Sequence, residues 1–216
     1  HKIAEILRTW DEAIEKASEL IKFGRAQYSG LRERLINWQT DPQKRLGSLV
    51  KPISRAVPRP NEPYRALSIR SHGKGTFSRM VADPTSVDMD TLYVARDGDL
   101  IVNITFAWEG AVALVPQEHD GCLVSHRFPT FVPSSPRVDA RYLRHALRMP
   151  RFTYLLGLVS PGGAGRNRVL NKGDFLNLEV PAPDLGKQEM IAACLDAAED
   201  AIANATEYRE ALTRQK

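Results

Sequence analysis

Two short segments of this chain concentrate side chains that could contact a polyanion. The first places cations among glycines: Arg70, His72, Lys74 and Arg79. The second follows a run of small residues with Arg166, Asn167, Arg168 and Lys172. Backbone N–H groups and guanidinium groups suit phosphate, and Asn and Arg side chains hydrogen-bond to the edges of adenine and guanine. Both segments are therefore candidate nucleic-acid contacts, and a solvated basic turn is the alternative for each.

Motifs that could support catalysis are incomplete. Asn61-Glu62-Pro63-Tyr64 is similar to the Asn-Pro-Pro-Tyr motif of amino-methyltransferases, but Glu replaces the first proline and no glycine-rich AdoMet loop follows a strand elsewhere. Gly162-Gly163-Ala164-Gly165 lacks the strand–GxGxxG–helix context, and no Walker motif is present. Ser125 and His126 adjoin without a nucleophile elbow. We predict no catalytic residue, which disfavours an autonomous methyltransferase.

Composition excludes several other classes of protein. The 216 residues are 43% hydrophobic, and no apolar run approaches the roughly 20 residues of a membrane span. Cys122 and Cys194 stand far apart without a CxxC or Cys/His cluster, so neither a metal site nor a disulfide framework is expected. A reducing cytoplasm is the expected location. Because the chain begins with His1 rather than Met, we interpret it as a fragment or a processed product.

The positive charge is concentrated in the middle of the chain. Residues 42–186 hold 19 Lys and Arg against 13 Asp and Glu, whereas the two ends together hold 11 against 13. Fifteen of the 19 central cations are arginine, whose guanidinium group binds phosphate and guanine in a bidentate manner. The distribution assigns contact with an anionic partner to the central region, although an arginine-rich soluble surface would have the same composition.

Both ends of the chain have the 4-3 apolar spacing of a long helix with a packing seam. The seam residues are Ile3, Leu7, Trp10, Ile14, Ile21, Leu31 and Leu35 in the first segment, and Ile191, Leu195, Ile202 and Leu212 in the last. Gly24 and Ser29-Gly30 are weak points of the first helix, which should end at Asp41-Pro42. We expect the two helices to pack antiparallel, since either alone would expose a long apolar stripe.

The two terminal segments also repeat each other. At a constant offset, Ile3 matches Ile191, Leu7 matches Leu195, and acidic residues align at Asp11 and Glu199. Two copies are too few for a solenoid. The repeat instead indicates two related helices on either side of a different kind of domain.

The central region reads as a mixed α/β domain. Short β-like runs are separated by Gly, Pro and Asp: Tyr64–Ile69, Leu92–Val94, Asp99–Ile104, Ala111–Val115 and His126–Val132. Val138–Leu147 and Phe152–Leu158 have helical spacing, and Phe175–Val180 resembles a final strand. The predicted fold class is therefore α+β, with domains at 1–41, 42–186 and 187–216.

In the passage Leu176–Leu195, a strand, a proline-rich linker and a Gln precede a helix. This passage is the strongest part of a resemblance to the specificity subunits of type I restriction–modification systems. The helical stretch Ile3–Ile21 and the segment Gly30–Ile36 are similar to the other conserved helix of the family. Tyr64–Phe77, Gly98–Pro116 and Gly165–Leu170 are similar to one branch of its target-recognition domains.

This resemblance implies a non-catalytic subunit that reads double-stranded DNA. Family members carry two recognition domains, held apart by an antiparallel coiled coil that docks methyltransferase subunits, and a motor/nuclease subunit joins for cleavage. The resemblance implies no cofactor in this chain, with AdoMet, Mg²⁺ and ATP on the partner subunits. With one recognition domain and two helices, the chain corresponds to the second half of a full subunit, or to a half-subunit that forms a homodimer.

A second hypothesis assigns the chain to a different functional class. The alanine-rich seam of the last helix and the modest net charge of +4 are also compatible with a helical protein-interaction module that does not recognise DNA. Binding to random duplex DNA at low salt separates the two hypotheses, since a DNA reader has at least a non-specific affinity.

Overall fold

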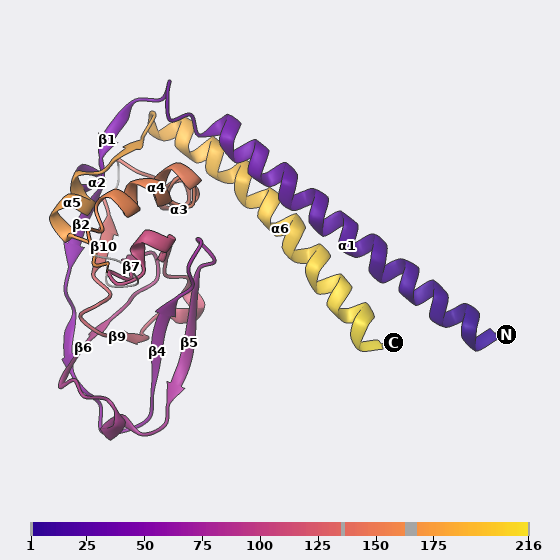
Figure 1. Ribbon diagram of the computed structural model, residues 1–216, viewed down its shortest axis with the longest axis horizontal. Coiled ribbons are helices and arrows are strands. Elements are labelled where there is room, and N and C mark those ends of the chain that lie inside the picture. Colours follow the sequence, from indigo (N-terminus) through magenta and orange to yellow (C-terminus); the bar gives the residue numbers. More distant parts are fainter. Residues whose placement is uncertain (1, 135–136, 163–167, 216) are drawn as a thin grey trace. The chain divides into compact units, whose positions relative to one another are not determined.

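The computed structural model describes residues 2–134, 137–162 and 168–215, and the chain divides into two compact units (Figure 1). The helical unit consists of the two terminal segments, up to Asn37 and from Met190 onward. The α/β unit is Trp38–Glu189. None of the helices in the described segments combines the length and the apolar character that a membrane span requires.

The helical unit is an antiparallel pair formed by α1 (Lys2–Leu35) and α6 (Leu185–Gln215), as predicted (Figure 1). Ala17, Ile21 and Tyr28 are buried on α1. α1 continues without a break through Gly24 and Ser29-Gly30 and ends at Leu35. A Cβ atom at Gly24 would lie 3.1 Å from Ile202 Cγ1, so the glycine permits close approach of the two helices instead of interrupting α1.

Three β-sheets form the α/β unit, and most of their strand pairs are antiparallel. The smallest pairs β1 (Gln43–Arg45) with β11 (Glu179–Pro181). A four-stranded sheet has the order β2 (Val50–Ile53), β10 (Thr130–Pro133), β7 (Leu100–Val102), β8 (Val112–Leu114). A five-stranded sheet has the order β3 (Ala56–Pro58), β6 (Thr91–Val94), β9 (Leu123–Val124), β4 (Tyr64–Ile69), β5 (Thr76–Val81). Only the single β4–β9 bridge in these sheets is parallel.

Short helices connect the strands and complete the core. They are α2 (Leu46–Leu49), α3 (Ala140–Leu147), α4 (Pro150–Leu158), α5 (Lys172–Asn177) and the 3₁₀ turns η1 (Pro84–Ser86), η2 (Ala107–Glu109) and η3 (Gln117–His119). Phe175 lies at the centre of the main core, with ring centroids 5.3 Å from Phe131 and 6.4 Å from Phe152. A smaller core that includes Leu67 and Val124 lies on the five-stranded sheet.

Two local predictions for this unit were wrong. Phe175–Asn177 belong to helix α5 and not to a strand, because Asn171 caps that helix: its Oδ1 accepts hydrogen bonds from the N–H groups of Gly173 (2.8 Å) and Asp174 (3.2 Å). The predicted strand is reduced to β11. Arg79 lies in strand β5, opposite Ala66 of β4, and not in a loop with Arg70.

The segment that leads into α6 is fixed by the side chain of Gln188, which is fully buried. Its Oε1 accepts from the N–H of Asp139 (3.0 Å), and its Nε2 donates to the carbonyl of Pro183 (2.7 Å). Asp184 accepts from the N–H of Lys187 (2.9 Å), which caps the helix start. Lys187 Nζ in turn pairs with the buried Asp41 at 2.5 Å.

Candidate nucleic-acid interface

The first basic segment is the tight turn between β4 and β5. The N–H of Arg70 donates to the carbonyl of Gly75 (2.9 Å), which closes the turn. Gly73 (φ 64°) and Gly75 (φ 77°) adopt left-handed backbone conformations, and so does His72 (φ 62°). A left-handed conformation is uncommon for a residue other than glycine. The surrounding contacts must therefore hold His72 in place.

Those contacts come from the 3₁₀ turn η2. The N–H of His72 donates to the carbonyl of Glu109 (2.7 Å), and the N–H of Gly73 donates to that of Gly110 (3.1 Å). Ser71 Oγ donates to the Glu109 carboxylate (2.7 Å). The basic turn is thus ordered before any ligand arrives, which lowers the entropic cost of binding.

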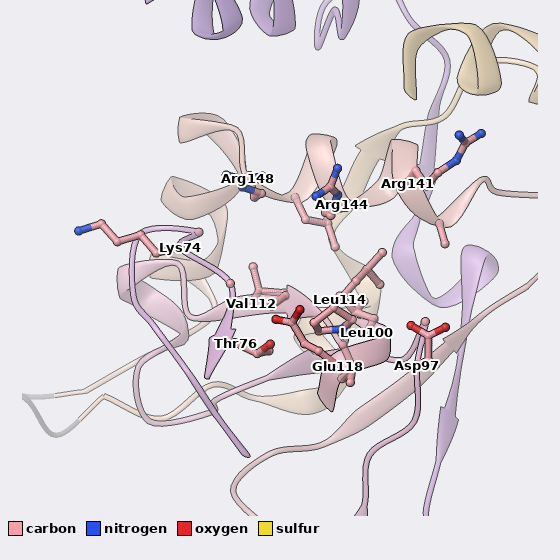
Figure 2. A pocket seen from close by; sticks show the side chains of 18 residues that line it. Lys74, Thr76, Asp97, Leu100, Val112, Leu114, Glu118, Arg141, Arg144 and Arg148 are labelled. Atoms are coloured by element: carbon pink, nitrogen blue, oxygen red, sulfur yellow. The ribbon is translucent and has the colours of Figure 1, made fainter. Parts of the chain in front are cut away.

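The cations of this turn differ in their freedom. The Arg70 guanidinium donates to the carbonyl of Thr76 (2.8 Å) and lies 4.7 Å from the centroid of the Phe77 ring. His72 and Lys74 are exposed, and the Lys74 side chain extends away from the body of the unit (Figure 2). The geometry suits a rigid backbone that presents Lys74 to a polyanion.

The second basic segment reaches the same 3₁₀ turn. Arg166 and Asn167 lie outside the described residues. Arg168 is half-buried, and its guanidinium carbon lies 5.5 Å from the ring centroid of Trp108. Trp108 Nε1 donates to the carbonyl of Thr105 (3.2 Å), which fixes the ring. The structure therefore brings Arg168 and the Arg70–Gly75 turn together around η2.

The other two predicted contact residues lie elsewhere in the unit. Arg79 is exposed on β5. Lys172 is the first residue of α5 and lines a separate cavity of about 480 Å³ together with Tyr93 and His126. The predicted set therefore divides into a group around η2 and two cations on other elements, β5 and α5.

Sequence reasoning missed the residues that hold the site together, Trp108, Glu109 and Gly110. It also missed Arg127, which is exposed and whose guanidinium donates to Thr105 Oγ1 (3.4 Å). A Gly after a Trp-Glu pair is a local signal for the left-handed residue that ends η2, and Gly110 has φ 75°. No local signal pairs Trp108 with Arg168, because that contact depends on the tertiary fold.

A cavity of about 510 Å³ lies beside the basic turn, between residues 73–76, strands β7 and β8, and helix α3 (Figure 2). Leu100, Val112 and Leu114 form its apolar part. Its polar lining carries both signs of charge: Lys74, Asp97, Glu118, Arg141, Arg144 and Arg148. With four basic against two acidic residues, the lining is net basic, as is the exposed turn at its edge.

Asp139 adds negative charge next to this cavity by capping α3. Burial alone raises the pKa of Asp139, but the Arg141 guanidinium (3.0 Å) and the N–H groups of Tyr142 and Arg141 donate hydrogen bonds to the carboxylate. These bonds outweigh burial, so the pKa of Asp139 lies below its ordinary value. Arg141 is consequently paired within the protein.

The predicted seam residues of the helical unit are unevenly covered. Ile21, Ile191 and Leu195 are buried, whereas Ile3 and Leu7 are exposed at the end where α1 extends beyond α6 (Figure 1). The remaining members are half-buried: Trp10, Ile14, Leu31, Leu35, Ile202 and Leu212. Most of the seam is thus at least partly covered, and its first turns are the part open to a partner.

The fold is similar to that of known restriction–modification proteins. The HsdS subunit of Thermoanaerobacter tengcongensis matches 99% of the chain with a TM-score of 0.60 and 17% identity. A second solved chain, from a structure described as the basis of complex assembly and conformational transition of the type I R-M system, matches 99% of this chain. Its TM-score is 0.59 and its sequence identity is 17%. The type I restriction–modification S subunit of M. genitalium matches 99% of the chain with a TM-score of 0.61 and 13% identity.

These matches involve only part of the known proteins. The chain covers 54%, 55% and 57% of the three solved chains, about half of their length. Neither a protein-family model nor a curated protein sequence matches it. The fold of this chain, one α/β unit with two long helices, is therefore that of about half of an HsdS specificity subunit.

Proposed function

We propose that this chain is the DNA-reading half of a type I restriction–modification specificity subunit. The observation that carries the proposal is the similarity of fold to HsdS subunits over 99% of the chain. The cations gathered around η2 support it, because phosphate contacts give affinity and a few base-edge contacts give specificity. The α/β unit would read one half of a split DNA site.

The same proposal defines the partners. The helical unit would dock methyltransferase subunits, and a motor/nuclease subunit would join for cleavage, as the similarity to a type I assembly suggests. The chain itself would be non-catalytic and cytoplasmic, with AdoMet, Mg²⁺ and ATP bound by its partners. The proposed DNA contacts are the eight predicted residues: Arg70, His72, Lys74, Arg79, Arg166, Asn167, Arg168 and Lys172.

Salt dependence of DNA binding tests this proposal. Each phosphate contact that is lost reduces the slope of log K against log salt by about 0.9. We expect Lys74→Ala and Arg168→Ala each to reduce the slope by about that amount in titrations of the chain with random duplex DNA. Lys74→Arg is the matched control, which keeps the charge and should keep the slope.

Two outcomes would contradict the proposal. The chain could fail to bind duplex DNA at low salt, both with and without a methyltransferase subunit. That result would favour the hypothesis of a helical protein-interaction module. Unchanged slopes in both alanine variants would remove Lys74 and Arg168 from the DNA contacts. One observation favours the interaction-module hypothesis: within the helical unit, α1 and α6 line an apolar groove of about 650 Å³ that includes Leu20, Phe23 and Ala201.

A further inference from the structure

The cavity of about 480 Å³ that Lys172 lines belongs entirely to the α/β unit. Its walls come from β2, β6, β10, α5 and the turn that precedes β10. Three aromatic residues that are not buried line it: Tyr93, His126 and Phe128. A cavity of this size, with a largely apolar and aromatic lining and a few polar groups, is typical of a site for a small ligand.

Two of these rings are held in place by the fold. Tyr93 lies in β6 between two other strands, opposite Ala56 of β3 and Val124 of β9. Phe128 follows a turn that is closed by its N–H group, which donates to the carbonyl of Ser125 (3.0 Å). Both rings pack against the smaller core of the five-stranded sheet. They therefore present aromatic surface to a ligand without a large ordering cost.

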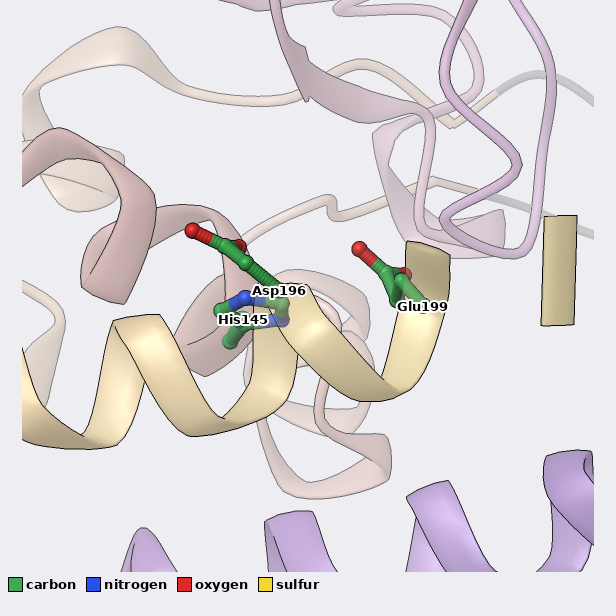
Figure 3. A group of neighbouring side chains, drawn as sticks. All are labelled: His145, Asp196 and Glu199. Carbon is green, nitrogen blue, oxygen red and sulfur yellow. The ribbon is translucent and has the colours of Figure 1, made fainter. Parts of the chain in front are cut away.

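The charge of the lining favours an anion. Lys172 is exposed at the cavity, and none of the described residues that line it is Asp or Glu. Carboxylates lie elsewhere: Asp97 and Glu118 line the cavity beside the basic turn, and Asp196 and Glu199 project from the same side of α6 (Figure 3). A negatively charged ligand is therefore the one whose charge this cavity complements.

The lining also offers polar groups for the edge of a planar ligand. Ser54 and Tyr93 bring hydroxyl groups, and His126 brings an imidazole, and each of these groups can both donate and accept hydrogen bonds. Within the described part of the chain, the Tyr93 hydroxyl, the His126 ring and the Lys172 ammonium form no hydrogen bond or ion pair with another residue. These three groups can therefore bind a ligand without first breaking a contact.

We infer that this cavity binds one nucleotide, with the base against the rings of Tyr93, His126 and Phe128 and the phosphate at Lys172. Aromatic side chains stack on the face of any base, and an ammonium group pairs with phosphate. A phosphate without a base would leave the rings unused, and a neutral aromatic ligand would leave Lys172 unused. The nucleotide is either a free mononucleotide or an unpaired position of a DNA strand, since both have this chemistry. The inference does not rest on the proposed function, whose duplex contacts centre on η2.

Equilibrium dialysis of the full chain against deoxyadenosine monophosphate tests this inference. We expect binding at millimolar concentrations of this nucleotide. Deoxyadenosine, which lacks the phosphate, and deoxyribose 5-phosphate, which lacks the base, should each bind more weakly. Absence of nucleotide binding, or equal binding of the nucleotide and deoxyribose 5-phosphate, would overturn the inference.

Variants at exposed positions separate the two parts of the ligand. Lys172→Ala should weaken binding of the nucleotide about 2- to 5-fold and leave binding of deoxyadenosine unchanged, whereas Lys172→Arg should preserve both. His126→Ala should weaken binding of both ligands about 5-fold or more. Lys44→Ala, at an exposed position of β1, is the matched control and should bind like the wild type. An equal loss for both ligands in Lys172→Ala would overturn the phosphate contact.

Competition with single-stranded DNA distinguishes the two sources of the nucleotide. Displacement of deoxyadenosine monophosphate by a short single-stranded oligodeoxyadenylate would assign the cavity to an unpaired nucleotide of a strand. Nucleotide binding that resists this competitor would assign it to a free mononucleotide. Binding of duplex DNA that depends on Lys74, without binding of the nucleotide, would overturn this inference and leave the proposed function standing. Binding of the nucleotide without binding of duplex DNA would do the reverse.

Discussion

Trp108 and Glu109 are the two residues that turn separate basic segments into one candidate site. Glu109 accepts hydrogen bonds from His72 and Ser71, and the ring of its neighbour Trp108 lies beneath the guanidinium of Arg168. The sequence identifies the cations because charge and glycine content are local properties. It does not identify their common support, because that support comes from contacts between distant parts of the chain.

The buried amide of Gln188 gives the first prediction at this scale. Gln188→Ala removes the acceptor of the part-buried Asp139 N–H and the donor to the buried Pro183 carbonyl. We expect a loss of about 1–3 kcal/mol in the free energy of unfolding, measured by urea titration. Gln117→Ala, at an exposed position of η3, is the control and should change it by less than about 0.5 kcal/mol. Equal effects of the two would refute the structural role of Gln188.

The buried phenol of Tyr142 leads us to predict that the free energy of unfolding depends on pH in alkaline solution. Its phenol is buried and donates to the carbonyl of Pro181 (3.1 Å), and burial raises the pKa of Tyr142 well above its ordinary value of 10.0. Above pH 10.0 the unfolded chain loses this proton while the folded chain keeps it. The stability that Tyr142 contributes is therefore complete below that pH and declines as the pH rises.

Comparing two Tyr→Phe variants isolates this effect. Tyr142→Phe should flatten the fall of the unfolding free energy in alkaline solution, whereas Tyr208→Phe, at a position that is 60% exposed, should leave it unchanged. Urea titrations at a series of alkaline pH values measure both. An unaltered pH dependence in Tyr142→Phe would mean that another group is responsible.

At the scale of elements, prediction succeeds where the signal is local. Strand β4 has the predicted bounds Tyr64–Ile69, and α3 and α4 lie within one or two residues of the predicted helices. Short strands such as β9 escape prediction because two residues carry no measurable alternation. Strand β5 was not predicted because the neighbouring residues Arg79 and Met80 are both exposed, so the strand lacks a regular apolar face.

The glycines of α1 allow a test of what stabilises this element. Gly30 has no other atom within 4 Å of an added Cβ, so Gly30→Ala should raise the free energy of unfolding by about 0.5–1 kcal/mol. Gly24→Ala has the same intrinsic benefit, but its Cβ would meet Ile202 Cγ1 at 3.1 Å. We therefore expect a smaller gain or a loss for Gly24→Ala. Thermal unfolding followed by circular dichroism compares the two, and an equal gain would show that the helices do not need this close approach.

At the scale of the whole molecule, the distribution of charge follows the division into a helical unit and an α/β unit. The arginine excess lies within residues 42–186, and the helical unit has nearly balanced charge. Composition alone indicates this separation, because net charge needs no knowledge of the fold. The bases that would be read are not predictable in this way, since base readout depends on the position of each side chain in a groove.

This division makes a prediction about where charge matters. Lys22→Ala and Arg8→Ala remove exposed cations of α1, so we expect both to leave the salt dependence of DNA binding unchanged. Fluorescence titrations over a range of salt concentrations, in parallel with Lys74→Ala, measure it. A reduced slope in the α1 variants would extend the DNA contact to the helical unit.

The pairing of β1 with β11 has a consequence for how the sequence of the α/β unit can be replaced. Gln43 lies opposite Pro181, and the N–H of Ala182 donates to the carbonyl of Pro42 (2.8 Å), so the chain enters and leaves the α/β unit at adjacent points. A segment that replaces the residues between these two points must close with the same short ladder, and it must also supply the N–H group that Asp139 donates to Gln188 of α6. A new recognition surface would then require only the replacement of one continuous cassette.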